Sequence, residues 1–295
     1  MSAVRRSLPL LALVAALAGC GGSSQKEPPA LLFVSTKDGD YAIFGADVQG
    51  KHERRLTKEK GDPSSPEGLY FQTEPAWSPD GAQIAFSSRR DGTAHIYVMR
   101  ADGKDARRLT STAKSDDHPS WSADGKRIVF GREGALFVVS ASGGAARRVG
   151  RGFGNAADPA WSPNGKLIAY DYRMPGTPVR ELYVMRVDGT HVRAVTKLGN
   201  VSAAPSWSPD GTRLAFQSNA RLGRFEIYTI DLDGKGLRQV TRAATDVFEP
   251  AWSPDGKTLA FSRDGAIWVD TVSEQTQLTS GTNDSSPAWR PVPPQ

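Results

Sequence analysis

Short apolar stretches recur along the chain from residue 31 onward, separated by polar turns. Ile84-Ala85-Phe86 and Ile96-Tyr97-Val98-Met99 are two of them, and they do not continue at the spacing of an amphipathic helix. Runs of this length, rich in β-branched and aromatic residues and bounded by Asp, Gly and Pro, indicate β-strands. The pattern therefore predicts an all-β fold.

Six copies of a Pro-x-Trp phrase divide the chain into similar units. Successive tryptophans of the phrase lie 44, 40, 46, 45 and 37 positions apart. The copies are Pro75-Ala76-Trp77, Pro119-Ser120-Trp121, Pro159-Ala160-Trp161, Pro205-Ser206-Trp207, Pro250-Ala251-Trp252 and Pro287-Ala288-Trp289. A repeat of this period, read as four short strands per unit, is typical of a propeller blade.

The first strand of each unit and the turn after it have their own signals. Proline cannot donate to a strand ladder, so we expect this strand to begin at its proline or to lie at a sheet edge. Ser78-Pro79-Asp80-Gly81 follows the first Trp and recurs in later units. Its order of residues predicts a type I turn that leads into a glycine bulge.

The two ends of the repeat region predict how the ring closes. Leu31-Leu32-Phe33-Val34-Ser35 aligns with the second strand of a unit, whereas Pro287-Ala288-Trp289 aligns with the first. Pairing these ends completes one blade and removes the open edge of a linear array. We therefore expect a six-bladed β-propeller of four-stranded antiparallel blades, closed by pairing the C-terminal inner strand with the N-terminal strands.

The first twenty residues differ from the rest. Arg5 and Arg6 precede an apolar run, Leu8 to Ala18, which is too short for a permanent membrane span and has the anatomy of a signal peptide. The run ends in Leu17-Ala18-Gly19-Cys20, which resembles the lipobox of bacterial lipoproteins. Cys20 is the single cysteine of the chain.

This segment sets the expected domain organisation. We expect a lipoprotein signal peptide over 1–19, a lipidated Cys20 and flexible tether over 20–29, and the propeller over 30–295. The protein would then be an extracytoplasmic, membrane-anchored lipoprotein of the periplasm or cell surface. A plain signal peptide with an incidental cysteine is the alternative.

Composition and charge narrow the class of partner. The chain has 295 residues, of which 38% are hydrophobic and 23% charged, with a formal net charge of +5. Removal of a leader that carries Arg5 and Arg6 leaves 35 basic and 32 acidic residues, a net charge of +3. This mild excess is compatible with an anionic envelope partner. Export and the lack of any nucleic-acid-binding motif argue against a role with DNA or RNA.

The repeat resembles a known family. Pro-Ala-Trp-Ser-Pro-Asp-Gly followed by Ile-Ala-Phe, Ile-Tyr-Val-Met and Arg-Arg-Leu-Thr is similar to the repeat of TolB-type β-propellers, and the resemblance spans nearly all of 30–290. It implies the propeller fold and leaves the function open, because this fold hosts many unrelated sites. TolB itself carries an α/β domain ahead of its propeller, for which the ten residues between Cys20 and the first strand leave no room.

The residue before each repeated proline is the first candidate for chemistry. The innermost strands run alongside the channel, so these six residues should ring one mouth. They are Glu74, His118, Asp158, Ala204, Glu249 and Ser286. Glu74, His118, Asp158 and Glu249 could together bind a cation or a basic side chain. The alternative is that they are solvated polar groups at a wet channel mouth.

Arginines in the longer loops are the second candidate. The connections after the second and fourth strands vary in length and share one face, where binding sites on a rigid scaffold usually lie. Arg89, Arg90, Arg221 and Arg224 are predicted on this face. A basic rim around an acidic mouth would suit a protein or glycan partner, with solvated loop arginines as the alternative.

No catalytic motif accompanies these candidates. The sequence has no Gly-x-Ser-x-Gly elbow, P-loop, Gly-x-Gly-x-x-Gly or His-Glu-x-x-His motif. We therefore expect a non-catalytic, monomeric binding or scaffold module without cofactor or metal, whose partner is an envelope protein or an anionic glycan. The alternative is a metal-dependent carbohydrate-active lyase or a lactonase that uses the channel mouth.

Overall fold

The computed structural model describes residues 27–57, 72–150, 154–221, 223–271, 274–281 and 283–292. The predicted signal peptide, Cys20 and most of the predicted tether lie outside these residues, as do residues 58–71. Within the described ranges no residue is helical, and no helix that could cross a membrane is found.

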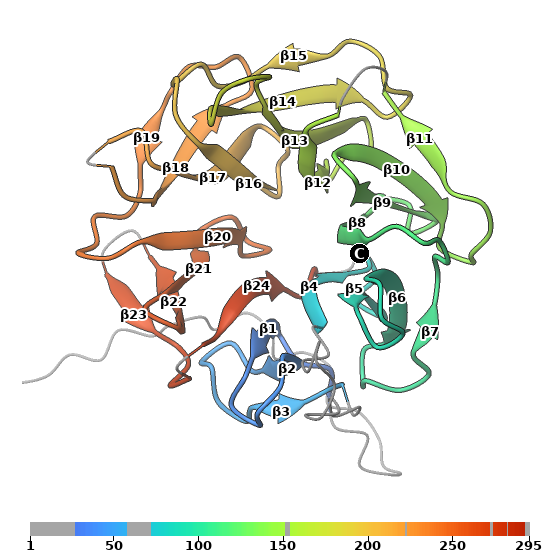
Figure 1. Ribbon diagram of the computed structural model, residues 1–295. Helices are drawn as coiled ribbons and strands as arrows, with labels where there is room; N and C mark the ends of the chain where they lie inside the picture. Colours follow the sequence, from blue (N-terminus) through green and yellow to red (C-terminus); the bar gives the residue numbers. More distant parts are fainter. Residues whose placement is uncertain are drawn as a thin grey trace, which may run out of the picture.

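Six four-stranded antiparallel sheets surround a central axis (Figure 1), as the repeat predicted. From the axis outward, blades 1 to 3 are β24 (Ser285–Trp289), β1 (Leu31–Ser35), β2 (Ala42–Ala46), β3 (Arg54–Arg55); β4 (Gln72–Trp77), β5 (Gln83–Ser88), β6 (His95–Arg100), β7 (Arg107–Arg108); and β8 (Asp116–Trp121), β9 (Arg127–Arg132), β10 (Ala135–Ser140), β11 (Arg147–Val149). Blades 4 to 6 are β12 (Ala156–Trp161), β13 (Leu167–Arg173), β14 (Arg180–Arg186), β15 (Arg193–Ala194); β16 (Ser202–Trp207), β17 (Arg213–Ser218), β18 (Glu226–Asp231), β19 (Arg238–Gln239); and β20 (Val247–Trp252), β21 (Leu259–Arg263), β22 (Ala266–Asp270), β23 (Gln275–Gln277).

The ring closes in blade 1 as the sequence predicted. β24, from the C-terminal end of the chain, pairs antiparallel with β1, with Trp289 opposite Leu31 and Ala288 opposite Leu32. The backbone N–H of Arg290 also donates to the carbonyl of Ala30 at 2.8 Å. Strand exchange between the two ends therefore holds blade 1 together (Figure 1).

The core lies between neighbouring blades, with large side chains of one sheet against small ones of the next. Ile84 and Phe86 of β5 pack on Leu32 and Ile43 of blade 1. Ala85, between them in sequence, faces the opposite way and packs with Trp121 and Phe130 of blade 3. Because successive strand residues point to opposite faces, one apolar strand contributes to two interfaces.

The repeated tryptophans join neighbouring blades. The indole N–H of Trp121 donates to the carbonyl of Ala76 at 3.1 Å, and that of Trp207 donates to Ala160 at 2.9 Å. Arginines of adjoining blades cover other indoles, with the guanidinium of Arg127 5.0 Å from the ring centroid of Trp161. Such contacts add cation–π attraction to apolar burial.

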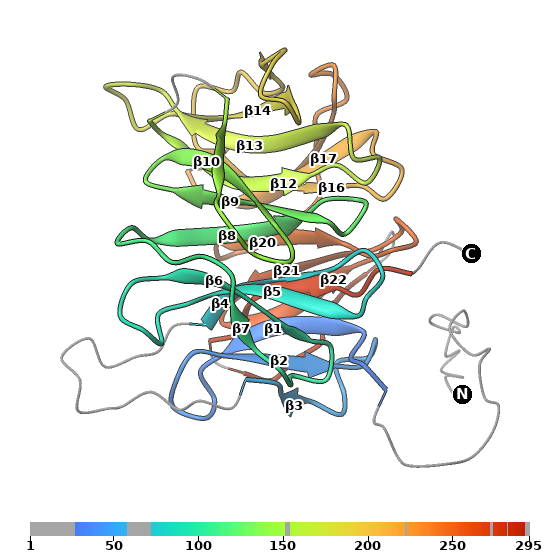
Figure 2. The same ribbon diagram turned by 90° about the vertical axis from the view of Figure 1, so that its right-hand side faces the viewer.

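The turns divide between two opposite faces of the ring, which Figure 2 shows from the side. The tight-turn face carries the turns after the first and third strands, such as Ser78–Gly81 and Ala101–Gly103. In the first, Gly81 N–H donates to Ser78 O at 2.8 Å and Gly81 has φ of 65°, as expected for the predicted turn. The variable-loop face carries the other connections, such as residues 89–94 and 174–179.

Glycine in the tight turn after a third strand allows neighbouring backbones to touch. A Cβ placed on Gly103, which has φ of +85°, would lie 2.4 Å from the carbonyl oxygen of Leu56 in blade 1. Gly50 and Gly189 meet backbone atoms of the preceding blade in the same way. This close approach fixes the spacing of the blades on the tight-turn face.

Removal of residues 284–295 should destabilise the whole ring. It strips β24 from β1 and exposes the apolar faces beside it, which should cost about 3 kcal/mol or more of a typical total of about 5–15 kcal/mol. Thermal unfolding followed by circular dichroism measures the effect. Removal of residues 291–295 alone, beyond β24, is the control and should leave the melting temperature nearly unchanged. An equal melting temperature for both truncations would contradict the closure.

Gly103→Ala should destabilise the protein more than Gly92→Ala. Both glycines have φ above +80°, which costs an L-residue about 1–2 kcal/mol. Only Gly103 also meets backbone, whereas a Cβ on Gly92 has nothing within 4 Å. We expect an additional loss of about 1–3 kcal/mol for Gly103→Ala, measured by urea unfolding. If both variants lost the same free energy of unfolding, the close approach of the two blades at Gly103 would make no contribution to stability.

Candidate functional site

Each inner strand contains a β-bulge at the residue before its proline. φ lies between 47° and 55° at all six positions, a left-handed conformation that is uncommon outside glycine. In blade 2 the pairing skips between Thr73 and Ala76, and the other blades show equivalent irregularities. The inner strands lie at sheet edges, which is one of the two alternatives expected for a strand that contains proline. β4 begins at Gln72, and Pro75 fits inside it because a bulge needs no ladder hydrogen bond there.

The bulge places the six predicted residues on adjoining strands around the axis. Neighbouring inner strands contact one another all the way round, from β4 through β8, β12, β16 and β20 to β24. The six residues are half-buried, and the prolines that follow them are buried. We use the term channel mouth for the six positions Glu74, His118, Asp158, Ala204, Glu249 and Ser286.

Three of these side chains come together across blades 2, 3 and 4. His118 Nε2 lies 3.1 Å from Asp158 Oδ1 and 3.4 Å from Glu74 Oε1. Glu74 Oε2 also accepts from the backbone N–H of His118 at 2.8 Å and from Ser87 Oγ at 2.9 Å. His118 thus bridges two carboxylates that belong to different neighbours.

This arrangement favours the charged form of His118. Burial lowers the pKa of the imidazole, but the carboxylates of Asp158 and Glu74, together with Asp117, outweigh burial and hold the pKa well above its ordinary value. His118 is therefore an imidazolium at neutral pH. Its charge partly neutralises the acidic side of the channel mouth.

Glu249 occupies a separate part of the channel mouth. Its carboxylate accepts from the backbone N–H of Ser286 at 2.7 Å, from Ser286 Oγ at 3.1 Å and from Ser262 Oγ at 3.1 Å. The N–H of Glu249 donates to Gln217 Oε1 of the preceding blade at 2.9 Å. Neutral donors therefore satisfy Glu249, in contrast to Glu74.

Asp171 extends the acidic group beneath Asp158 and was missed from the sequence. It lies on β13 with a fully buried side chain, opposite Ala157 of β12. Burial and the neighbouring carboxyl of Asp158 raise the pKa of Asp171 to about 8, against the opposing effect of its ion pair with Arg180. The equivalent position in other blades holds a residue without an acidic group, namely Ser87, Gly131, Gln217 or Ser262. The one acidic residue in this series was therefore the feature of the sequence that could have indicated Asp171.

The predicted rim arginines differ in their contacts. Arg90 lies over Tyr97, with its guanidinium carbon 4.4 Å from the ring centroid, and Arg224 donates to the carbonyls of Ala243 and Ala244 at 3.0 and 2.8 Å. Arg89 and Arg221 are exposed on the variable-loop face. Arg90 and Arg224 thus contribute to the scaffold, and Arg89 and Arg221 are the more accessible pair.

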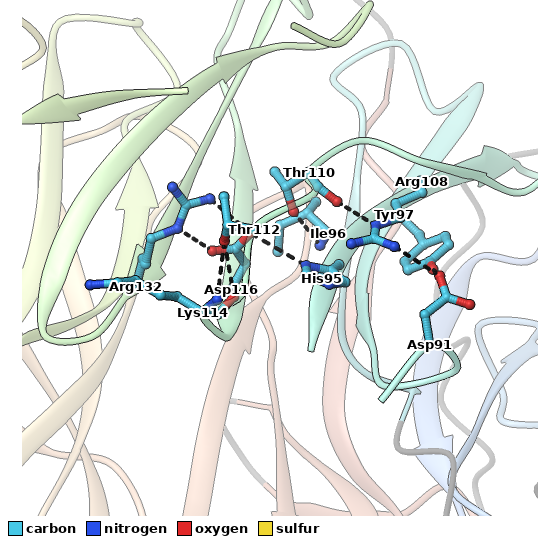
Figure 3. Close-up of polar contacts among 10 residues, drawn as sticks. All are labelled: Asp91, His95, Ile96, Tyr97, Arg108, Thr110, Thr112, Lys114, Asp116 and Arg132. Atoms are coloured by element: carbon cyan, nitrogen blue, oxygen red, sulfur yellow. Dashed lines mark hydrogen bonds and ion pairs between the residues drawn. The ribbon is translucent and has the colours of Figure 1, made fainter. Parts of the chain in front are cut away.

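Figure 3 shows a further polar cluster between blades 2 and 3. His95, the first residue of β6, has Nδ1 3.9 Å from Asp116 Oδ2, and Arg132 donates to both oxygens of Asp116 at 2.5 and 2.9 Å. Burial, reinforced by Arg108, lowers the pKa of His95 despite the acidic groups nearby. His95 is therefore neutral at pH 7, and the Asp116–Arg132 pair joins β8 to β9 away from the channel mouth.

Within the described ranges, no three or more His, Cys, Asp or Glu side chains are grouped so that they could hold a metal ion. The contacts of the channel mouth are hydrogen bonds and ion pairs in which N–H and hydroxyl groups donate to carboxylates. This arrangement can recognise hydrogen-bonding cations and polar groups.

The family match covers most of the chain. The family profile described as the TolB beta propeller domain matches residues 13–135, 67–175 and 133–293. The overlapping matches follow the internal repeat and together include all six blades.

Curated relatives are similar over short segments. A segment of 74 residues is 40% identical to the uncharacterized peptidase YuxL of Bacillus subtilis, and it covers 25% of this chain and 11% of that protein. A segment of 68 residues is 37% identical to the Tol-Pal system protein TolB of Syntrophus aciditrophicus, and it covers 23% of this chain and 13% of that protein. The chain thus spans only a small part of the length of these relatives.

Solved structures share the fold over a larger part of the chain. TolB from Acinetobacter baumannii matches with a TM-score of 0.75 and 19% identity, over 89% of this chain and 66% of that one. A putative TolB from Agrobacterium tumefaciens matches with a TM-score of 0.54 and 28% identity, over 60% of this chain and 66% of that one. An oligogalacturonate lyase in complex with manganese reaches a TM-score of 0.54 at 17% identity, over 84% of this chain and 73% of that one, which shows a shared fold alone.

The profile match over nearly the whole repeat region agrees with the propeller architecture. This chain belongs to the TolB β-propeller domain family.

Proposed function

We propose that this protein is a cell-envelope lipoprotein whose propeller is a non-catalytic binding or scaffold module. Its partner is an envelope protein or an anionic glycan, which contacts the channel mouth and the exposed arginines of the variable-loop face. The observation that carries the proposal is the bridge from Glu74 through His118 to Asp158. It brings an imidazolium and two carboxylates together on residues whose backbone has a positive φ. Such strained residues often occur at binding sites.

The comparisons support a binding role more than any one reaction. One relative is named as the Tol-Pal system protein TolB, and that name states no reaction. The peptidase relative is matched over only 11% of its length, so its activity gives no argument for catalysis in this chain.

The positions of β1 and β24 support an orientation in which the tight-turn face of the propeller lies near the membrane. Arg290 donates from its backbone to Ala30 and from Nε to the carbonyl of Gly81 at 3.3 Å. The start of β1 and the end of β24 thus lie beside a turn of the tight-turn face. A tether over 20–29 reaches roughly 30 Å at about 3.4 Å per residue. An anchor at Cys20 would keep the tight-turn face near the membrane and present the variable-loop face outward.

Cys20→Ser should move the protein from the membrane fraction to the soluble fraction. Several acyl chains together bind a bilayer firmly, and among the described residues no helix could cross a membrane in their place. Fractionation with a salt wash, followed by immunoblotting, measures the distribution. Ser23→Ala in the tether is the control and should stay with the membrane. A Cys20→Ser protein that also stays there after the wash would refute the lipid anchor.

Variants of the channel mouth and of the exposed rim should lose partner binding while they keep the fold. The first carries Glu74→Gln, Asp158→Asn and Glu249→Gln, which keep an acceptor oxygen at each position. The second carries Arg89→Ser and Arg221→Ser. In a capture experiment with an extract of the cell's own envelope, the wild-type protein identifies the partner. Each variant should capture at least tenfold less of that partner than the wild type does, as measured by quantitative mass spectrometry.

Lys126→Ser with Lys257→Ser, on the tight-turn face, is the matched control and should capture as much as the wild type. Melting temperatures of all variants show whether the fold survives. If the control alone loses the partner, the outward-facing site is wrong and the membrane-proximal face becomes the binding surface.

A further inference from the structure

A pocket of about 270 Å³ lies between blades 2 and 3, beside the channel mouth. Blade 2 lines it from β4, from the end of β5 and from the loop before β6, and blade 3 lines it from the beginning of β8. Most of its lining is polar and includes Thr73, Ser87, Ser88, Arg89, Ser115 and Asp117. Arg89 is exposed and the Asp117 side chain is 49% exposed, so the pocket opens to solvent on the variable-loop face.

The hydroxyl groups of Ser87 and Ser88 offer a ligand opposite hydrogen-bonding capacities. Ser87 Oγ donates its proton to Glu74 Oε2 at 2.9 Å, so it can accept from a ligand through its lone pairs. Ser88 Oγ accepts from the backbone N–H and from Nε of Arg90 at 3.3 and 3.2 Å, so its own proton can be donated to a ligand. Two consecutive residues of the lining therefore supply one acceptor and one donor.

Two charged side chains extend this set of donors and acceptors. The guanidinium of Arg89 carries N–H donors alone, and the carboxylate of Asp117 carries acceptors alone. Asp117 Oδ1 lies 3.6 Å from His118 Nδ1, which is too long for a hydrogen bond, so the carboxylate keeps acceptor capacity toward the pocket. The pocket thus presents donors and acceptors side by side.

This lining disfavours apolar and charged ligands. Among the described residues that line the pocket, Ala94 alone is apolar, so an apolar group would leave polar groups without water or partners. An anion would meet the carboxylates of Asp117 and Glu74. A cation would compete with the His118 imidazolium, which these two carboxylates already contact. An uncharged ligand with many hydroxyl groups avoids all three costs.

A pyranose ring matches both the chemistry and the size of the pocket. Its hydroxyl groups stand on adjacent carbon atoms, and each of them can donate and accept. The volume of about 270 Å³ lies just below the range of about 300–1,000 Å³ that is typical of pockets for larger small molecules. The pocket therefore suits one ring, with the remainder of a longer saccharide lying over the variable-loop face.

We propose that the pocket between blades 2 and 3 binds one uncharged pyranose ring of a glycan. Ser87 and Asp117 accept hydrogen bonds from the ring hydroxyls, and Ser88 and Arg89 donate to them. The proposal rests on the proposed binding function and names the part of a glycan partner that is recognised beside the channel mouth.

Saturation-transfer NMR with simple glycosides tests the pocket. The probes are the methyl glycosides of glucose, galactose, mannose and N-acetylglucosamine, added to the full chain in a detergent without sugar headgroups. At least one should bind with a Kd on the order of 1 mM, because a ligand of this size has few atoms to contribute. The uronic acid of the same configuration should bind about tenfold more weakly, because its carboxylate meets those of the pocket.

A variant that fills the pocket shows where the glycoside binds. Ser115→Phe places an aromatic ring in the lining and should weaken binding by about tenfold or more, since a filled pocket excludes the sugar. Asn155→Phe is the matched control, because Asn155 precedes Asp158 by three residues as Ser115 precedes His118. It should bind the glycoside as well as the wild type does.

A second variant removes one acceptor without filling the space. Asp117→Ala should weaken binding by about tenfold, because it loses a hydrogen bond to a charged group. Asp188→Ala, in a tight turn on the opposite face, should leave binding unchanged. Melting temperatures show whether each variant folds. Asp117→Ala keeps the test decisive if Ser115→Phe does not fold, because the Asp117 side chain is half-exposed.

Three outcomes would overturn the proposal. The first is that none of the neutral glycosides binds, and the second is that both pocket variants bind them as the wild type does. The third is that glucuronic acid or glucosamine binds more tightly than the neutral sugars, which would indicate recognition of charge. If no glycoside binds but envelope capture still depends on the channel mouth and the exposed rim, the binding function stands and only the sugar pocket is refuted.

Discussion

The bulge ahead of each repeated proline is the constraint on which the rest of the ring depends. It leaves one backbone N–H of the inner strand without a ladder partner, and an unpaired buried N–H is costly. Where the partner is seen, the preceding blade supplies it: Glu74 accepts from His118, Gln217 from Glu249, and Glu249 from Ser286. The side chains of the channel mouth therefore also join the blades, so its polar contacts contribute to the stability of the ring.

The two faces of the ring carry different constraints. On the tight-turn face, glycines such as Gly103 bring backbones of neighbouring blades into contact, and any larger residue would push them apart. The variable-loop face connects strands that are already held by the bulges and the interblade core. Loops can change there without moving the scaffold, which is why the exposed arginines and the channel mouth lie on the side that is free to vary.

The repeat made the fold predictable, because six copies of one pattern give the strand order, the turns and the closure through the alignment of Leu31–Ser35 with later second strands. Contacts between blades were harder to predict. The bulge cannot be seen in the sequence of one strand, so the sequence left open whether Pro75 begins an inner strand or lies within one at a sheet edge. The sequence predicts Arg90 as a charged residue of an exposed loop, whereas in the structure its guanidinium packs on the ring of Tyr97. Asp171 follows an aromatic residue on an ordinary strand and becomes notable only because β12 places Asp158 against it.

The six positions of the channel mouth thus share one backbone conformation but carry side chains with different charges and hydrogen bonds. Ala204 contributes no polar group, and Glu249 is satisfied by hydroxyl and amide donors that hold no charge. On the opposite side, Glu74 and Asp158 share one imidazolium, and Asp171 adds a buried carboxyl that pairs with Arg180. The ion pairs of the channel mouth therefore lie on one side of the axis, and the uncharged donors of Glu249 lie on the other. Because the repeated fold cannot create that asymmetry, it comes from the few residues that break the repeat in blades 2 to 4.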